Sequence, residues 1–447
     1  MKNLLIFIFL MCFSFSYSQD TPTSFTLQEA IDYALKNNRT AKNAARDIEA
    51  AKKQKWETTA TGLPQLNASI NYQNFLKQQI SLVPAEFFGG EPGEFAEVIF
   101  GTQQNVNATA TLSQLLFDGS YLVGLQSAKV FLEISENAKN KTDLQVRKAV
   151  INAYGNVLLA EESIKIFEKN ISILEKNLDE TTKIYENGLG EEESIEQLQI
   201  TLSNVKSGFN NAVRLRSIAY QMFNITIGID YNTNVTLAEN LEQLAQKNIA
   251  LNVLEQDNDV ANTIDYKIAA NDKTAKALLL KLEKSKALPR LSAFLNGGYL
   301  GFSDAFTFFN RNQNWAGFSA FGLNIDIPIF SSGGRNAATQ RAKINLEKSI
   351  DNLTETEQML KLQIETAKSN YKFATEDYNN KKENLALAER IESKNQTKFF
   401  EGIGSSFELR QAQTQLYAAQ QELLQALLDV VNSKAELETI TNNISAN

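Results

Sequence analysis

Carboxylates are the main side chains in this sequence that could carry acid–base or metal chemistry. Histidine is absent, and the single cysteine is Cys12. Histidine-based acid–base catalysis, Ser-His and Cys-His nucleophile pairs and the commonest transition-metal ligand are therefore excluded. The densest acidic run is Glu191–Glu193. It could bind a metal cation, or it could be a solvated first helical turn that the helix dipole stabilises.

Catalysis by these carboxylates would need two of them to converge in one cleft. The long helices described below offer no such cleft, so we predict that the chain is not an enzyme and has no cofactor and no metal site. Four methionines and no histidine also argue against a relay for soft metal ions. A balance of 44 basic against 52 acidic residues, a net charge of −8, argues against nucleic-acid binding.

Residues 118–222 are predicted to form one very long helix, a tight turn and a returning helix. From Val146 to Leu178 apolar residues recur at alternating steps of four and three, which is the period of a coiled coil. The glycines of Gly188-Leu189-Gly190 then end the helix. At 1.5 Å per residue, the roughly seventy residues from Gly119 to Asn187 would span about 100 Å, far more than an ordinary globular helix.

The same hairpin occurs again in the second half of the chain. Phe330–Gly334 opens it, Gly402-Ile403-Gly404 forms its turn, and a return arm follows. A repeat of half the chain length indicates a duplicated domain. We therefore divide the sequence into a first repeat at 19–228, a linker at 229–257 with a short amphipathic helix around Leu237 and Leu241, and a second repeat at 258–447.

Each repeat begins with a helix and then changes its period from 3.6 to two. Helices are expected at 26–61 and 260–287. After Leu63-Pro64, apolar residues alternate with small polar ones near 66–73 and again near 105–113, with a loop from Pro84 to Gln104 between them. After Leu288-Pro289, strands are expected at about 291–302 and 314–329. Such alternation predicts strands with one apolar and one polar face, which is typical of outer-membrane barrels and also of half-exposed soluble sheets.

Aromatic residues are concentrated between 291 and 330, where ten occur in forty residues. At a bilayer interface they would form an aromatic girdle. The alternative is the aromatic core of a soluble domain.

Residues 1–18 are predicted to be a signal peptide. A short basic start precedes the apolar run Leu4–Phe15, and Ser16–Ser18 offers small residues for cleavage. The alternative is a lipidated N-terminus at Cys12, but lipidation usually needs a small residue where this chain has Met11. No later segment offers the ~18 unbroken apolar residues of a membrane-spanning helix. We therefore expect an exported protein.

The two repeats supply four strands, and four strands cannot close a barrel in lipid. If the strands span a membrane, several chains must pool them. The sequence therefore predicts a homo-oligomer whose helices form a second tube continuous with the barrel.

In its order of elements the chain resembles the TolC-like outer-membrane efflux proteins. The resemblance rests on four features of the sequence. They are Leu27–Asn38, Leu63–Leu66 with Leu288–Leu291, Leu116–Ser120 with Ile329–Gly333, and the two tips that begin at Tyr185 and Phe400. The resemblance implies a mixed α and β membrane protein with an internal two-fold repeat. In it, a long antiparallel α-helical coiled-coil barrel continues into a transmembrane β-barrel that a homotrimer shares, four strands per chain.

The resemblance also implies the function. The chain would be the outer-membrane exit duct of a tripartite efflux or type I secretion system in a Gram-negative bacterium, with its helical tunnel in the periplasm. A periplasmic adaptor and an inner-membrane pump would be its partners, and the pump would supply the energy.

The resemblance further implies which residues act. The tips Gly188, Leu189, Gly190, Gly402, Ile403 and Gly404 would dock on the adaptor. The ring of acidic residues that narrows the tunnel in the family falls on Glu408, on Gln411 and, in the first hairpin, near Ser194. Only Glu408 keeps the charge, and a lone carboxylate at such a position is more often a solvated helix residue than a gate.

One rival class is a non-channel, periplasm-spanning coiled-coil protein with a structural or adaptor role. The alternating strands and the aromatic residues argue against it, because an adaptor needs no lipid-facing strand.

Overall fold

The computed structural model describes residues 24–249 and 259–443, so the predicted signal peptide lies outside the described residues. The chain divides into two compact units. The helical unit comprises the described residues of Met1–Ile48, Ser135–Ala269 and Leu353–Asn447, and the sheet unit comprises Glu49–Ile134 and Ala270–Asn352. Each unit draws on both halves of the chain, so the two repeats are interleaved.

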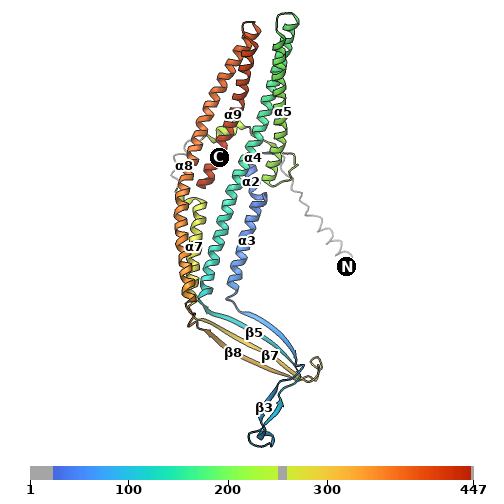
Figure 1. Cartoon of the computed structure of the whole chain (residues 1–447), viewed down its shortest axis with the longest axis vertical. Coiled ribbons are helices and arrows are strands. Elements are labelled where there is room, and N and C mark those ends of the chain that lie inside the picture. The colour runs from blue at the N-terminus through green and yellow to red at the C-terminus, as the bar shows by residue number, and fades with distance from the viewer. Residues whose placement is uncertain (1–23, 250–258, 444–447) are drawn as a thin grey trace, which may run out of the picture. The chain divides into compact units, whose positions relative to one another are not determined.

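The sheet unit contains the four strands that the period-two pattern predicted. They are β2 (Gln65–Asn74), β5 (Gln104–Asp118), β7 (Arg290–Ser303) and β8 (Trp315–Asp326). All pairs are antiparallel and the order is β2-β5-β7-β8, so β2 and β8 are the edges (Figure 1). In the sheet unit, α7 (Ile264–Ser285) leads into β7 and α3 (Arg39–Ala60) leads into β2.

The connection between β2 and β5 is more ordered than the expected loop. It contains the antiparallel pair β3 (Ile80–Pro84) and β4 (Phe95–Ile99), joined through the 3-10 helix η1 (Ala85–Phe88). The expectation of an irregular loop from Pro84 to Gln104 is therefore wrong. The glycines and prolines that suggested it form the turn of this hairpin instead.

The strand register gathers apolar side chains on one face of the sheet, which we call the apolar face. Residues that lie directly opposite each other on adjacent strands point to the same side of the sheet, so each cross-strand pair shares a face. Two rows across the four strands show it: Leu66, Leu112, Leu295, Phe321 and Ile70, Ala108, Tyr299, Gly317. On the other face β2 and β5 present Asn, Gln, Ser and Thr, as at Asn67, Asn71 and Thr109.

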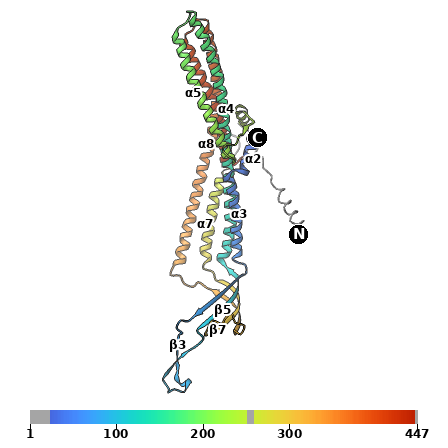
Figure 2. The ribbon, with the colours of Figure 1, turned by 90° about the vertical axis from the view of Figure 1, so that its right-hand side faces the viewer.

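The helical unit contains most of two antiparallel hairpins, whose turns lie at one end (Figures 1 and 2), and the first residues of each hairpin belong to the sheet unit. The first is α4 (Gly119–Glu186) with α5 (Glu192–Ile227), and the second is α8 (Gly334–Phe400) with α9 (Ser406–Thr441). Both predicted hairpins are thus confirmed. The 68 residues of α4 correspond to about 100 Å at 1.5 Å per residue.

An apolar seam holds each hairpin together, and the one in the first hairpin was predicted. Leu174 of α4 is fully buried against Leu198 and Leu202 of α5. In the second hairpin Ala388 of α8 packs with Leu416 of α9. This packing is what stabilises such long helices, since propensity alone leaves an isolated helix marginal.

The predicted single helix at 26–61 is two helices, α2 (Leu27–Asn37) and α3. The break is at Asn38, whose ψ of 134° leaves the helical region. Its Oδ1 accepts hydrogen bonds from the N–H groups of Thr40 (2.8 Å) and Ala41 (3.3 Å), so it caps α3. A pattern of apolar residues does not reveal such a break.

The described part of the linker also differs from expectation. Leu237 belongs to β6 (Thr236–Leu237), which pairs in parallel with β1 (Ser24–Phe25), and the short helix α6 (Leu241–Asn248) begins after it. The helix expected at 260–287 is shorter, since residues Val260–Asn262 form the separate 3-10 helix η3 and α7 begins at Ile264.

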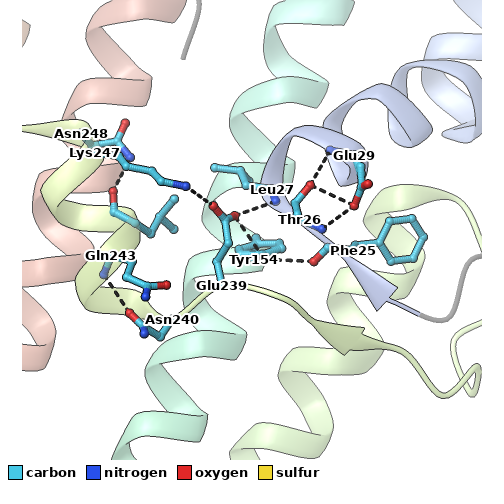
Figure 3. Close-up of polar contacts among 11 residues, drawn as sticks. Phe25, Thr26, Leu27, Glu29, Tyr154, Glu239, Asn240, Gln243, Lys247 and Asn248 are labelled. Carbon is cyan, nitrogen blue, oxygen red and sulfur yellow. Dashed lines mark hydrogen bonds and ion pairs between the residues drawn. The ribbon is translucent and has the colours of Figure 1, made fainter.

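One carboxylate ties these short elements to α4 (Figure 3). Glu239 accepts hydrogen bonds from the Leu27 N–H (2.9 Å), the Lys247 Nζ (2.8 Å) and the Tyr154 hydroxyl (3.4 Å). The same hydroxyl also donates to the Phe25 carbonyl at 3.1 Å. Burial alone would raise the pKa of Glu239, but the hydrogen bonds from Lys247 and Leu27 outweigh it and hold the pKa below its ordinary value.

We expect Glu239→Gln to lower the free energy of unfolding by about 1–3 kcal/mol, because charged hydrogen bonds at the start of α2 are lost. A lowered folded-state pKa means that this stability is present above the ordinary glutamate pKa of about 4.3 and is lost as the pH falls through the folded value. Thermal unfolding of both proteins between neutral and acidic pH measures it. The difference should shrink in acid, and the exposed Glu242→Gln is the matched control. A difference that does not depend on pH would contradict this role of the charge.

Candidate functional site: the helical tips and the apolar face

The first tip is the turn between α4 and α5. Gly188 has a φ of +75°, in the left-handed region that favours glycine. Its N–H donates to Tyr185 O (2.8 Å), and the N–H of Leu189 donates to Ile184 O (3.1 Å). These two bonds form a Schellman motif, which satisfies the last carbonyls of α4. The turn leaves the Leu189 side chain 81% exposed.

The second tip repeats both Schellman bonds of the first. Gly402 has a φ of +73°, and its N–H donates to Phe399 O (3.1 Å). The N–H of Ile403 donates to Lys398 O (3.0 Å), and its side chain is 73% exposed. The G-x-G resemblance between the turns therefore reflects one backbone geometry. Both tips place a single exposed apolar side chain directly after the left-handed glycine.

Glu408 has a structural role that the sequence analysis missed, although Ser405 and Glu408 have the spacing of a capping box. Its carboxylate accepts a hydrogen bond from the Ser405 N–H (3.3 Å), and the Ser405 hydroxyl accepts one from the Glu408 N–H (3.2 Å). This capping box begins α9 directly after the tip. Glu408 and Gln411 are both exposed on the first turns of α9.

Ser194 lies apart from these two side chains. It is 8% exposed, and it lines a narrow gap between the two hairpins with Phe399, Leu409 and Gln413. Within one chain it therefore packs between hairpins, whereas Glu408 and Gln411 face outward.

Buried polar side chains link the two hairpins, and the sequence reasoning missed them. Asn170 of α4 donates to Gln420 of α9 at 2.8 Å, and Gln396 of α8 donates to Asn177 of α4 at 3.0 Å. With Ser163, the two asparagines form a buried row spaced by seven residues. That spacing is visible in the sequence and marks a second, polar contact face of α4 beside the apolar seam.

The contact face between α8 and α9 also buries groups that titrate. Burial raises the pKa of the Glu392 carboxyl. Burial, and then the nearby charge of Glu392, raises the pKa of the Tyr417 hydroxyl. A raised carboxyl pKa shows that this position disfavours charge.

The apolar face of the sheet is exposed along its length. Leu66, Ile70 and Phe321 each leave most of their surface uncovered. At the end farthest from the helices, Tyr72 packs edge-on against Phe306 (5.6 Å between ring centroids) and Phe308 (6.0 Å). The aromatic concentration seen in the sequence therefore gathers at the border of an apolar band.

Within residues 24–249 and 259–443 we find neither a cluster of metal ligands nor a helix that could cross a membrane. No three acidic or cysteine side chains there come together to hold a metal ion. None of the helices in these ranges has an apolar stretch that would let it cross a membrane.

Comparison with known proteins identifies relatives over nearly the whole chain. The family model described as outer membrane efflux protein matches residues 30–222 and 269–443. A comparison with curated protein sequences finds no match.

Solved structures share the fold. The structure of CusC, a protein reported to form a transmembrane channel, superposes with a TM-score of 0.74 at 19% identity. The match covers 96% of this chain and 95% of that one. The outer membrane channel CmeC of Campylobacter jejuni gives 0.70 at 18% identity, covering 96% and 90%. The outer membrane protein VceC of Vibrio cholerae gives 0.70 at 15% identity, covering 93% and 95%.

We expect Asn170→Leu to lower the free energy of unfolding by about 1–3 kcal/mol, because Gln420 is left buried without its partner. The double variant Asn170→Leu/Gln420→Leu should recover much of that loss, since both polar groups are gone. Denaturant unfolding of the detergent-solubilised protein measures both. The exposed Gln415→Leu on α9 is the control. If the two losses simply add, the hydrogen bond does not couple the hairpins.

Proposed function

The chain belongs to the outer membrane efflux protein family, and we propose that three copies of it close one barrel. As a member of this family it is an outer-membrane exit duct of a tripartite efflux system. One observation carries the proposal. A four-stranded sheet with a continuous apolar face ends in two edge strands, β2 and β8.

Three copies would remove these edges. In lipid every backbone N–H and C=O needs a partner, so an open edge is not tolerated. Pairing β8 of one protomer with β2 of the next yields a closed barrel, which membrane barrels reach at about eight strands and more. A homotrimer satisfies this with twelve strands, and its outward apolar faces meet the outer-membrane lipid.

The helical hairpins of the trimer would form the periplasmic tunnel. Each protomer contributes α4, α5, α8 and α9, with both tips at the same end. A passive duct of this kind needs no catalytic residue, and an inner-membrane pump supplies the energy through a periplasmic adaptor. A purely structural or adaptor protein would have no use for the exposed apolar face of the sheet.

The tips are the proposed docking surface for the adaptor. Leu189 and Ile403 stand exposed on rigid Schellman turns, and exposed apolar side chains on rigid supports are suited to recognition. Gly188 and Gly402 provide the backbone geometry, and Gly190 and Gly404 complete the turns.

We expect Leu189→Asp combined with Ile403→Asp to weaken adaptor binding at least about tenfold, equivalent to ~1.4 kcal/mol. Both side chains face solvent, so the fold and the oligomer should be unchanged. Surface plasmon resonance with a purified periplasmic adaptor measures the binding, and Leu189→Met with Ile403→Met is the matched control. Unchanged binding of the aspartate variant would exclude the tips as the docking surface.

Glu408 and Gln411 are the proposed lining of the constriction, because both are exposed just beyond the second tip. Three copies of Glu408 would form an acidic ring that favours cations. Ser194 stays a prediction, since its burial gives it a packing role in the single chain.

Glu408→Gln tests this ring without disturbing the helix, because glutamine also serves in a capping box. We expect the cation-to-anion permeability ratio to fall by roughly a factor of two to ten, and Gln411→Glu to raise it, because each change alters three charges at one narrow place. Single-channel recording in planar bilayers measures the ratio. The exposed Glu355→Gln on α8 is the control. Ratios that stay equal in all variants would place the constriction elsewhere.

A further inference from the structure

An exposed apolar loop joins β8 to α8, at the end of the sheet where the helices begin (Figure 1). It comprises Ile327–Phe330, and we call it the junction loop. Ile327 is 62% exposed, Ile329 87% and Phe330 85%. Three large apolar side chains exposed within four residues form a patch that needs a partner.

Arg335 holds the backbone of the junction loop. From the first turn of α8, its Nη1 donates to Pro328 O (2.6 Å) and its Nη2 donates to Ile329 O (3.1 Å). Its own N–H donates to the Ser331 hydroxyl at 3.3 Å. One guanidinium thus satisfies two carbonyls that lie outside the sheet ladder.

Arg335 lowers the cost of placing the backbone of this loop in lipid. Backbone groups without partners cost several kcal/mol each in an apolar medium. Pro328 has no N–H to satisfy, and Arg335 satisfies the carbonyls of Pro328 and Ile329. An ordinary surface loop, hydrated by water, would not need these contacts.

The loop also continues the apolar face. Phe321, Leu323 and Ile325 occupy alternate positions of β8 on that face. The ladder ends at Asp326, and the same alternation runs on through Ile327 and Ile329. The face meets outer-membrane lipid, and this end of the sheet leads into the periplasmic helices. The loop therefore lies at the periplasmic border of the lipid.

We propose that the junction loop is a phospholipid anchor. Ile329 and Phe330 insert into the periplasmic leaflet of the outer membrane, and Arg335 is the positioning residue that keeps the loop in the inserted geometry. Its charge lies where arginine is favoured, at the level of the lipid phosphates. This inference rests on the membrane placement of the apolar face.

Depth-dependent quenching tests the anchor in the full mature chain. Cys12 lies in the predicted signal peptide, so an introduced cysteine would be the single labelling site. A nitrobenzoxadiazole fluorophore on Phe330→Cys is measured in vesicles of phosphatidylethanolamine and phosphatidylglycerol that carry spin-labelled chains. We expect quenching by a label near the head group to exceed that by a label near the chain end by more than about twofold, as for an interfacial side chain.

Two reference sites separate the possible outcomes. Leu295→Cys, in the middle of the apolar face, should be quenched most by the deep label, and Leu189→Cys, at the helical tip, by neither. If Leu295→Cys is quenched and Phe330→Cys is not, the anchor is wrong and the membrane placement stands. If neither is quenched, the placement itself fails, and the anchor with it.

Arg335→Ala tests the positioning role in the Phe330→Cys background. Quenching at Phe330→Cys should fall at least about twofold, because the freed carbonyls draw the loop toward water. Quenching at Leu295→Cys should not change. Arg335→Lys should recover only part of the effect, since one ammonium cannot reproduce the fork on two carbonyls. Unchanged quenching at Phe330→Cys in Arg335→Ala would remove the positioning role.

Discussion

The requirement that backbone polar groups be paired in lipid is the constraint on which the rest of this structure depends. A buried, unpaired amide costs several kcal/mol in an apolar medium. Four strands can satisfy their inner ladders but not the outer edges of β2 and β8. Closure by other copies, as proposed above, would pair both edges, and Arg335 already pairs two carbonyls beyond the ladder.

The helical hairpins depend on a different constraint, because very long helices must be stabilised along their whole length. A helix of 68 residues is stable only when a continuous seam buries one of its faces. Here α4 packs against α5 through apolar residues such as Leu174, and it also shares a large apolar cluster with α5, α8 and α9. Nearer the tips, Asn170 and Asn177 hydrogen-bond to α9 and α8. Hydrogen bonds such as Asn170 to Gln420 specify how the hairpins align but contribute less burial.

The two halves of the chain show how a duplication becomes one structure. Their tips keep the same Schellman bonds around Gly188 and Gly402. Their strands pair across the duplication, β5 with β7, and each compact unit contains parts of both halves. The duplicated segments have diverged where their surroundings differ. Only the second tip leads into a capping box, formed by Ser405 and Glu408.

Sequence alone determined whatever repeats with a regular period. The heptad steps from Val146 to Leu178 predicted the long hairpins, and period-two alternation predicted the four strands, because these patterns follow directly from helix and strand geometry. The glycines of the tips marked the turns, because a left-handed backbone strongly favours glycine. The resemblance to the efflux proteins followed from the order of these elements.

Only the tertiary structure decided what depends on partners distant in the chain. The register that aligns Leu66 with Phe321 across four strands and the burial of Ser194 between hairpins both require contacts that no local pattern encodes. The same holds for Glu239, whose partners Leu27 and Tyr154 are brought to it by the fold. Periodicity fixes which face of an element is apolar, and long-range packing fixes what that face meets.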